Sequence, residues 1–176
     1  MYIASLVISI VAAFALAGLF FYLLAKRFFD TQQKQQLLQM KIDERRETLK
    51  TVTPIRLQAY ERVALFLERI SPNSLVLRCY QPGMDLHLLQ GVMTKNIRDE
   101  WEHNLSQQVY VSEELWAHVR EAKDEMVNLI NSSAVSLADT DDPTRLAATI
   151  FASAADRMPT DVALTALHKE LHELFG

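Results

Sequence analysis

The sequence predicts an all-α protein, in which an N-terminal transmembrane helix continues into a stalk helix and is followed by a cytoplasmic helical bundle. Three observations support this fold class. The 176 residues include only four glycines and five prolines, a composition that favours helices. The first 25 residues are nearly all apolar. Further along, apolar residues recur with the helical period of about 3.6, and no alternation is long enough for a sheet.

Residues 3–25 contain no charged side chain. A bilayer core requires roughly 20 apolar residues in a helix, so this segment is long enough to span it. A cleaved signal peptide is the alternative, with "AFALAG" as the cleavage region. No Lys or Arg precedes the apolar run, however, and apolar residues continue through 19–24 beyond that region. We therefore predict a single-pass transmembrane anchor over residues 1–25.

The charges around this segment predict its orientation. Lys26 and Arg27 follow it directly, and only two residues precede it. The positive-inside rule then predicts an N-terminus outside and a C-terminal domain in the cytoplasm, the orientation that we expect in the cell (inner) membrane. The single cysteine, Cys79, is compatible with a reducing compartment.

Small residues recur every four positions within the anchor. Such a row lets two membrane helices approach closely, which makes a homo-oligomer possible. Small residues are also common in anchors that do not associate, so both interpretations stay open. The row consists of Ser5, Ser9, Ala13 and Ala17.

Residues 26–52 are predicted to form a helical stalk. Residues 26–50 carry seven Lys/Arg and four Asp/Glu, a net charge of +3, which suits the anionic headgroups of a lipid bilayer. Residues 51–176 carry eleven Lys/Arg and eighteen Asp/Glu, a net charge of −7, which argues against nucleic acid as a partner. A thin apolar seam indicates either pairing along the stalk or a solvated spacer. The seam consists of Leu37, Leu38, Ile42 and Leu49.

A cytoplasmic helical domain is predicted over residues 53–176. Pro54 suits the first turn of a new helix, with Thr53 as its cap. The next segment, "SLVLRCY", is either two helical turns or an extended piece. We then predict helices over about 84–108, from after the capping Ser112 to about 131, over 143–156 and over 160–175. The helix that is predicted to begin at Pro54 carries an apolar stripe of Leu57, Tyr60, Val63, Ala64, Leu67 and Ile70.

Three segments, "TPIRLQAYERVALFLERISPNSLVLR", "QPGM" and "EWEHNLSQQVYVSEELW", resemble an uncharacterised family of small bacterial single-pass membrane proteins. The resemblance extends from about Thr53 to Asn131. It implies the same layout and a location in the cell membrane. It supplies no activity and no catalytic residues.

A polar patch interrupts the apolar face of the helix predicted over 84–108. We interpret it as a latch at a helix–helix junction, because buried polar groups require partners. Partner binding is the alternative. A catalytic role would make Glu100 an acid or base with His103 beside it, but no nucleophile accompanies them. The patch consists of Glu100, His103, Asn104 and Gln107.

Other polar residues are interpreted as structural. His168 and His172 are four apart and could share a ligand, but no third metal ligand has matching spacing. Cys79 lies among apolar residues and is predicted to be buried. Asp141 or Asp142 is predicted to cap the helix at 143, since the aspartates lack the glycine and distal glutamate of a calcium loop. No cofactor motif is present.

Two functions remain open. The first is a non-enzymatic, membrane-tethered scaffold that binds a protein partner, or its own copy, at the cytoplasmic face. The alternative is a membrane-bound enzyme or metal-binding domain. It would use either Glu100, His103 and Asn104 or the pair of histidines at 168 and 172.

Overall fold

The computed structural model describes the backbone of residues 2–155 and 157–175, and their side chains except those of 4–13, 15, 17, 25, 30, 31 and 175. The chain divides into two units, one that ends at Val52 and one from Thr53 to Gly176. Every regular element in the described backbone is helical. The predicted all-α class, with a helical bundle, is confirmed.

The first helix, α1 (Tyr2–Ile70), contains Pro54 in its interior. The prediction that Pro54 begins a new helix capped by Thr53 is therefore wrong. Proline removes one backbone hydrogen bond and costs about 3 kcal/mol inside a helix. Tyr60 and Val63 follow it and are fully buried, and tertiary packing of this kind outweighs local propensity.

Among the helices that the structure describes, none is long and apolar enough to cross a membrane, so the predicted transmembrane helix is not found there. Most side chains of the predicted anchor, residues 3–25, lie outside the described set. The association row predicted within it, Ser5, Ser9, Ala13 and Ala17, lies wholly outside.

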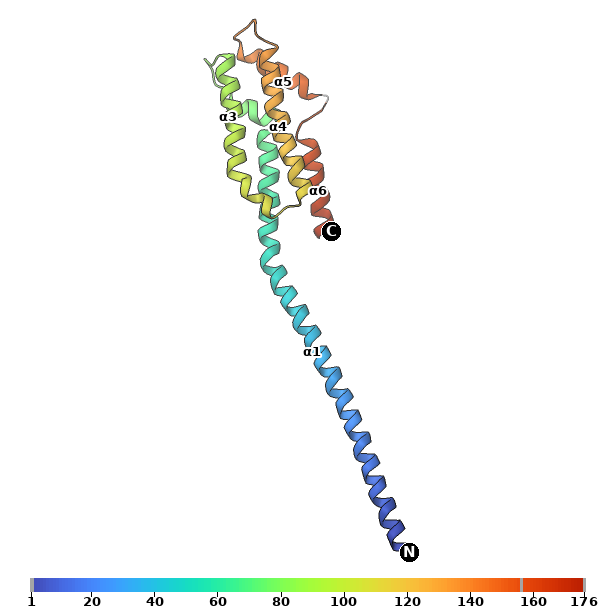
Figure 1. Cartoon of the computed structure of the whole chain (residues 1–176). Coiled ribbons are helices and arrows are strands. Elements are labelled where there is room, and N and C mark those ends of the chain that lie inside the picture. The colour runs from blue at the N-terminus through green and yellow to red at the C-terminus, as the bar shows by residue number, and fades with distance from the viewer. Residues whose placement is uncertain (1, 156, 176) are drawn as a thin grey trace. The chain divides into compact units, whose positions relative to one another are not determined.

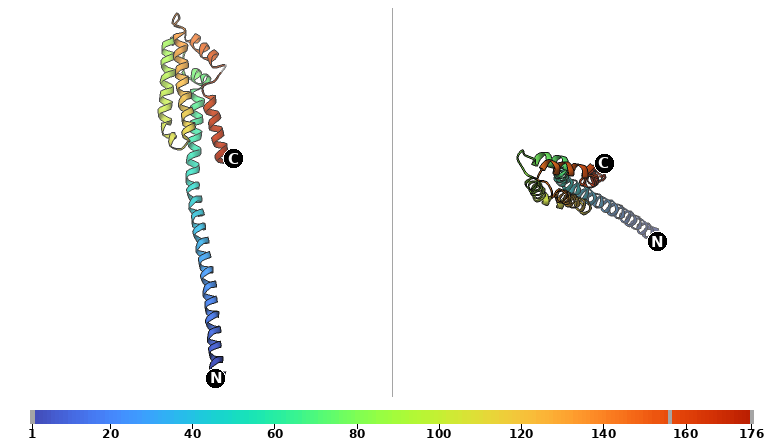
Figure 2. Two further views of the ribbon diagram at one scale, coloured as in Figure 1. Left: turned by 45° about the vertical axis from the view of Figure 1, so that its right-hand side comes forward. Right: turned by 90° about the horizontal axis from the view of Figure 1, so that it is seen from above.

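Helix α4 is the centre of the second unit, because it packs against α3, α5 and α6. The short helix α2 packs against α3 and α5. Figure 1 shows α3 and α4 side by side along most of their length, and Figure 2 shows the same unit from two further directions. The elements are α2 (Pro72–Cys79), α3 (Leu86–Asn104), the 3-10 helix η1 (Leu105–Val109), α4 (Glu113–Val135), α5 (Pro143–Ala155) and α6 (Asp161–Phe175).

Side-chain caps fix the starts of three helices. The carboxylate of Asp85 accepts a hydrogen bond from the backbone N–H of Leu88 at 2.7 Å. The hydroxyl of Ser112 accepts one from Leu115 at 3.0 Å, and Asp142 accepts one from Thr144 at 2.8 Å. The predicted caps at 112 and 142 are thus confirmed. The helix predicted over 84–108 is shorter than expected, since α3 ends at 104 and η1 follows.

An aromatic stack joins the core to the partly buried Trp101. The rings of Trp101 and Trp116 are stacked, with centroids 4.9 Å apart, and Phe66 lies 5.8 Å from the Trp101 ring. Leu57 is 45% exposed, so its place in the predicted apolar stripe is wrong. The residues that α1 buries fully are Ala59, Tyr60, Val63, Phe66, Leu67 and Ile70.

We expect the fragment from Thr53 to Gly176 to fold without the preceding residues. Its apolar side chains form one buried cluster whose members all lie between Tyr60 and Leu167, apart from partly buried neighbours. Circular dichroism should show a strongly helical fragment that unfolds cooperatively, with the same midpoint in a chelator. A disordered fragment, or a midpoint lowered by chelation, would contradict this expectation.

Candidate functional site

A groove runs between α1 and α3, at the place where the sequence predicts the polar patch. Its volume is about 490 Å³. One wall belongs to the last turns of α1 and the other to the second half of α3. The lining residues are Arg62, Leu65, Phe66, Arg69, Asn96, Asp99, Glu100, His103 and Asn104.

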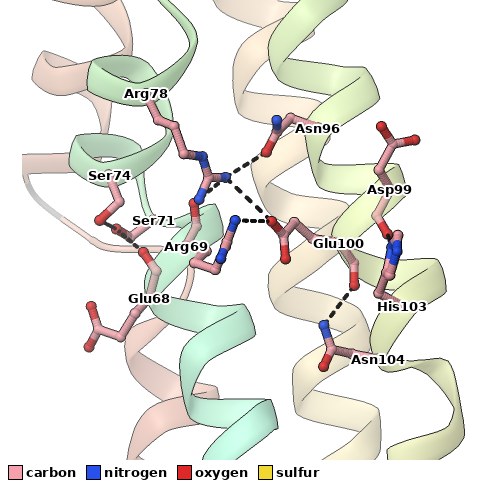
Figure 3. A network of polar contacts seen from close by, with 10 residues as sticks. All are labelled: Glu68, Arg69, Ser71, Ser74, Arg78, Asn96, Asp99, Glu100, His103 and Asn104. Atoms are coloured by element: carbon pink, nitrogen blue, oxygen red, sulfur yellow. Dashed lines mark hydrogen bonds and ion pairs between the residues drawn. The ribbon is translucent and has the colours of Figure 1, made fainter.

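Glu100 is the centre of an ion-pair cluster beside this groove (Figure 3). Its carboxylate lies 2.7 Å from the guanidinium of Arg69 and 4.0 Å from that of Arg78. Arg78 also donates hydrogen bonds to the carbonyl of Arg69 at 3.2 Å and to the amide oxygen of Asn96 at 2.5 Å. The cluster therefore connects α1, α2 and α3. Because the Glu100 side chain is only 17% exposed, its charge requires these partners.

The neighbouring polar residues bond their own helix. His103 Nδ1 lies 2.7 Å from the carbonyl oxygen of Asp99, and the amide of Asn104 donates to the carbonyl of Glu100 at 2.8 Å. Figure 3 shows both bonds within α3, with no dashed line from either side chain to the arginines. The three predicted residues thus share a groove, but their side chains do not converge on one point. Gln107, in η1, is buried and donates to Ser106 at 3.1 Å.

Two side chains of the α1 wall are open to a ligand. Leu65 is 54% exposed. Arg62 is exposed, and among the described residues it has no hydrogen-bond or ion-pair partner. Beneath them, the buried side chain of Phe66 forms an apolar floor. The groove can therefore bind a partner that presents an apolar side chain to Leu65 and Phe66 and a carboxylate to Arg62.

A second polar cluster surrounds Glu170 of α6. Its carboxylate accepts hydrogen bonds from the Tyr60 hydroxyl at 2.5 Å, from the backbone N–H of Ser112 at 3.0 Å and from the Ser112 hydroxyl. Arg56 donates to the Tyr60 oxygen at 2.9 Å and to the carbonyl of Tyr110 at 3.1 Å. The cluster therefore joins α1, the start of α4 and α6.

This environment shifts the pKa of both acidic groups in the cluster. Burial raises the pKa of Tyr60 to about 12, and the hydrogen bond and charge of Glu170 add to the effect, while Arg56 opposes it. Burial would also raise the pKa of Glu170, but hydrogen bonds from Ser112 and Tyr60 outweigh it and lower that pKa below 4.5.

We expect a late tyrosine titration in alkaline solution. Because the pKa of Tyr60 is raised from 10.0 to about 12, its contribution to stability is complete below pH 10 and is lost as the pH rises through 12. The loss should amount to about 2–3 kcal/mol. Tyrosinate absorbance should show a separate step near pH 12 that accompanies unfolding and is absent from Tyr60→Phe. A titration with no such step would contradict the burial argument.

The two histidines of α6 lie on the surface of the helix, as the structural interpretation predicts. His168 and His172 are both exposed, and no group of three or more His, Cys, Asp or Glu side chains within the described residues could hold a metal ion. Glu170, between them, was missed. A signal was present, because Glu170 lies three positions after the buried Leu167, on the apolar face of the helix. Cys79 is buried, as predicted.

The comparisons with known proteins place the chain in a family. No curated protein and no solved structure matches it significantly. A family model described as a family of unknown function, DUF7935, matches residues 1–174. This match confirms the predicted membership of an uncharacterised family, while bacterial origin and a membrane location stay predictions. The chain belongs to the DUF7935 family of unknown function.

Proposed function

We propose that this chain is a non-enzymatic, membrane-tethered interaction module whose helical domain binds a protein partner in the groove between α1 and α3. The observation that carries the proposal is the α1 wall of the groove. Leu65 is half exposed and Arg62 is unpaired among the described residues, side by side above an apolar floor. Arginine is enriched at protein interfaces and at their hot spots, and here an arginine without a partner lies beside an exposed apolar side chain that a bound protein would cover.

The bonding of the predicted polar patch supports a binding role over a catalytic one. The Glu100 carboxylate is engaged by Arg69 and Arg78. His103 and Asn104 are engaged by backbone carbonyls of their own helix. A general acid–base pair requires an acid and a base that both reach the same substrate atoms. These contacts instead hold the α3 wall of the groove rigid.

The tether is the part of the proposal that rests on the sequence. The uncharged segment 3–25 would cross the cell (inner) membrane once, and the basic residues after it would lie on the cytoplasmic side. The helical domain would then present its groove to partners at the membrane surface. A second copy of the chain is one of those possible partners.

Site-specific photocrosslinking in membranes of the source cells tests the groove. A photoreactive amino acid at position 65 should give one defined adduct, which mass spectrometry identifies as another protein or as a second copy. The same amino acid at position 77 is the control, since Leu77 is 79% exposed but belongs to α2 and lies outside the groove lining. Arg62→Glu should abolish the adduct at 65 by reversing the charge next to it.

The outcomes separate binding from chance contact. Equal labelling from positions 65 and 77 would reflect random collision and would refute the groove as an interface. An adduct at 65 that survives Arg62→Glu would show that the arginine does not take part. Circular dichroism of the variants should be unchanged, because the altered positions, 62, 65 and 77, are all exposed.

A reporter fusion tests the orientation of the tether. A reporter joined after Gly176 should be active only in its cytoplasmic form, because Lys26 and Arg27 favour the cytoplasmic side. Reversing the bias, with Lys26→Glu and Arg27→Glu plus lysines before Ile3, should weaken the preference. Activity of a periplasmic reporter on the unmodified chain would refute the proposed orientation.

A further inference from the structure

The stalk, residues 26–52 of α1, has an exposed apolar seam, which shares three residues with the predicted seam, adds Val52 and leaves out Leu37. Four of its positions follow the alternating spacing of four and three residues that is typical of a coiled coil. Leu38, Ile42, Leu49 and Val52 are between 40% and 62% exposed. Arg45 occupies the remaining seam position between Ile42 and Leu49. Apolar side chains at these positions are usually covered by another helix.

The residues that flank the seam carry charge of one sign. Coiled-coil partners are selected by charges at the positions on either side of the seam. Three of the flanking positions hold Lys or Arg, and none holds Asp or Glu. The acids between residues 38 and 52, Asp43, Glu44 and Glu47, lie on the outer face, where Glu47 pairs with Lys50 at 3.1 Å. The flanking residues are Gln32, Lys34, Gln39, Lys41, Arg46 and Thr48.

This pattern opposes pairing with a second copy. In a parallel pair of identical stalks, Lys41 of one copy would face Arg46 of the other, because the two positions are five residues apart. The two Arg45 side chains would also meet within the seam. Like charges at close range repel, and a buried cation without a partner is costly.

The pattern also fits a lipid surface poorly. In the tethered form, Lys41 lies about 24 Å along the helix from residue 25, at about 1.5 Å per residue. The attraction of an anionic bilayer falls off within about 10 Å at ordinary salt concentrations. Lys41 and Arg46 therefore lie beyond its reach when the stalk leaves the membrane steeply.

We infer that the stalk binds an acidic amphipathic helix of another protein. Apolar residues of that helix cover Leu38, Ile42, Leu49 and Val52, and its flanking Asp or Glu side chains pair with Lys34, Lys41 and Arg46. A carboxylate within its seam faces Arg45. This surface belongs to the first unit of the chain and does not depend on the groove of the helical domain.

Peptide binding to the full-length chain in detergent tests the inference. The probe is a fluorescent peptide of about four heptads, with glutamate at the flanking positions and leucine at the seam positions, except for one seam glutamate placed to face Arg45. Its twin carries lysine in place of every flanking glutamate. Fluorescence anisotropy should show that the acidic peptide binds at least about tenfold more tightly than the twin, and that its binding weakens as salt is added.

Two matched variants locate the contact. Lys41→Glu alters a flanking position and should lower the affinity for the acidic peptide about tenfold. Lys50→Glu makes the same change of charge on the outer face, where the Lys50 side chain is 72% exposed, and should leave the affinity within about twofold. The double variant Lys34→Glu/Lys41→Glu should prefer the lysine twin. Tryptophan fluorescence confirms that the helical domain is intact, because both tryptophans lie within it.

Several results would overturn the inference. Equal affinity for the two peptides, or an equal loss of affinity in Lys41→Glu and Lys50→Glu, would show that the flanking charges do not select the partner. If the Leu38→Glu variant in detergent has a lower particle mass than the unmodified chain, the seam is occupied by a second copy. In nanodiscs, protection of Lys34 and Lys41 from an amine reagent by anionic lipid alone would identify the bilayer. Arg62→Glu should not alter peptide binding, so failure here is distinguishable from failure of the proposed groove.

Discussion

Replacing Phe66 with alanine is expected to lower the free energy of unfolding by about 3–5 kcal/mol. Phe66 is 1% exposed, and its ring lies 5.8 Å from that of Trp101. Alanine would leave a cavity under the groove and remove the contact between α1 and the two stacked tryptophans. Urea unfolding monitored by tryptophan fluorescence measures the effect, because Trp101 and Trp116 report directly on this part of the core.

The adjacent residue supplies the control. Leu65 is 54% exposed, so Leu65→Ala should change the stability by no more than about 1 kcal/mol. Phe66→Leu retains much of the apolar volume and should cost less than Phe66→Ala. A Phe66→Ala variant as stable as Leu65→Ala would show that the aromatic stack does not hold α1 in the bundle.

Phe66 also shows that the helical period of a single segment does not predict every buried side chain of a helix. The segment after Pro54 predicts an amphipathic helix, and Tyr60, Val63, Leu67 and Ile70 are buried as expected. The buried face is nevertheless rotated, so that Phe66 is inside and Leu57 is outside. Periodicity gives the direction of an apolar face only approximately, and the neighbouring helices decide how far around the helix it is covered.

Local chemistry was the most predictable part of the fold. The starts of α4 and α5 follow from Ser112 and Asp142, because a cap and the N–H groups that it binds are separated by only a few residues. The continuity of α1 through Pro54 could not be predicted in this way. It depends on burial of the residues that follow, which is a tertiary effect.

The polar groups illustrate the same limit. Glu100 continues an apolar helix face, which predicts a polar contact at a helix junction, and the structure places it at such a junction. Its partners, Arg69 and Arg78, come from other helices, and nothing in the spacing along α3 identifies them. Glu170 carries the same signal on α6. Its partners, Tyr60 and Ser112, likewise come from other parts of the chain.

Removal of the Glu170 carboxylate should therefore have the second-largest effect on stability. We expect Glu170→Ala to lower the free energy of unfolding by about 2–4 kcal/mol, because hydrogen bonds to a charged group contribute about 1.5–3 kcal/mol and stranded donors add a penalty. The stranded groups would be the Tyr60 hydroxyl and the backbone N–H of Ser112. Urea unfolding of the chain in detergent, followed by tryptophan fluorescence, measures the change.

A nearby glutamate of the same helix separates this network from a general effect of charge. Glu173 is 66% exposed and lies 4.0 Å from Lys169, so Glu173→Ala should change the stability by no more than about 0.5 kcal/mol. Similar losses from Glu173→Ala and Glu170→Ala would contradict a specific role for the buried network. Glu170→Gln retains the shape of the side chain and should fall between them.

The pH dependence of unfolding tests whether the ionised carboxylate of Glu170 stabilises the folded chain. The pKa of Glu170 is lowered in the folded chain, so its contribution is complete above its ordinary value of 4.5 and is lost as the pH falls through the lowered value. The difference in stability between the unmodified chain and Glu170→Gln should therefore shrink steadily as the solution is acidified below that point. A difference that stayed constant, or grew, would mean that the carboxylate is not stabilised by Ser112 and Tyr60. The loss of stability on Glu170→Ala would then have to come from lost packing of α6 alone.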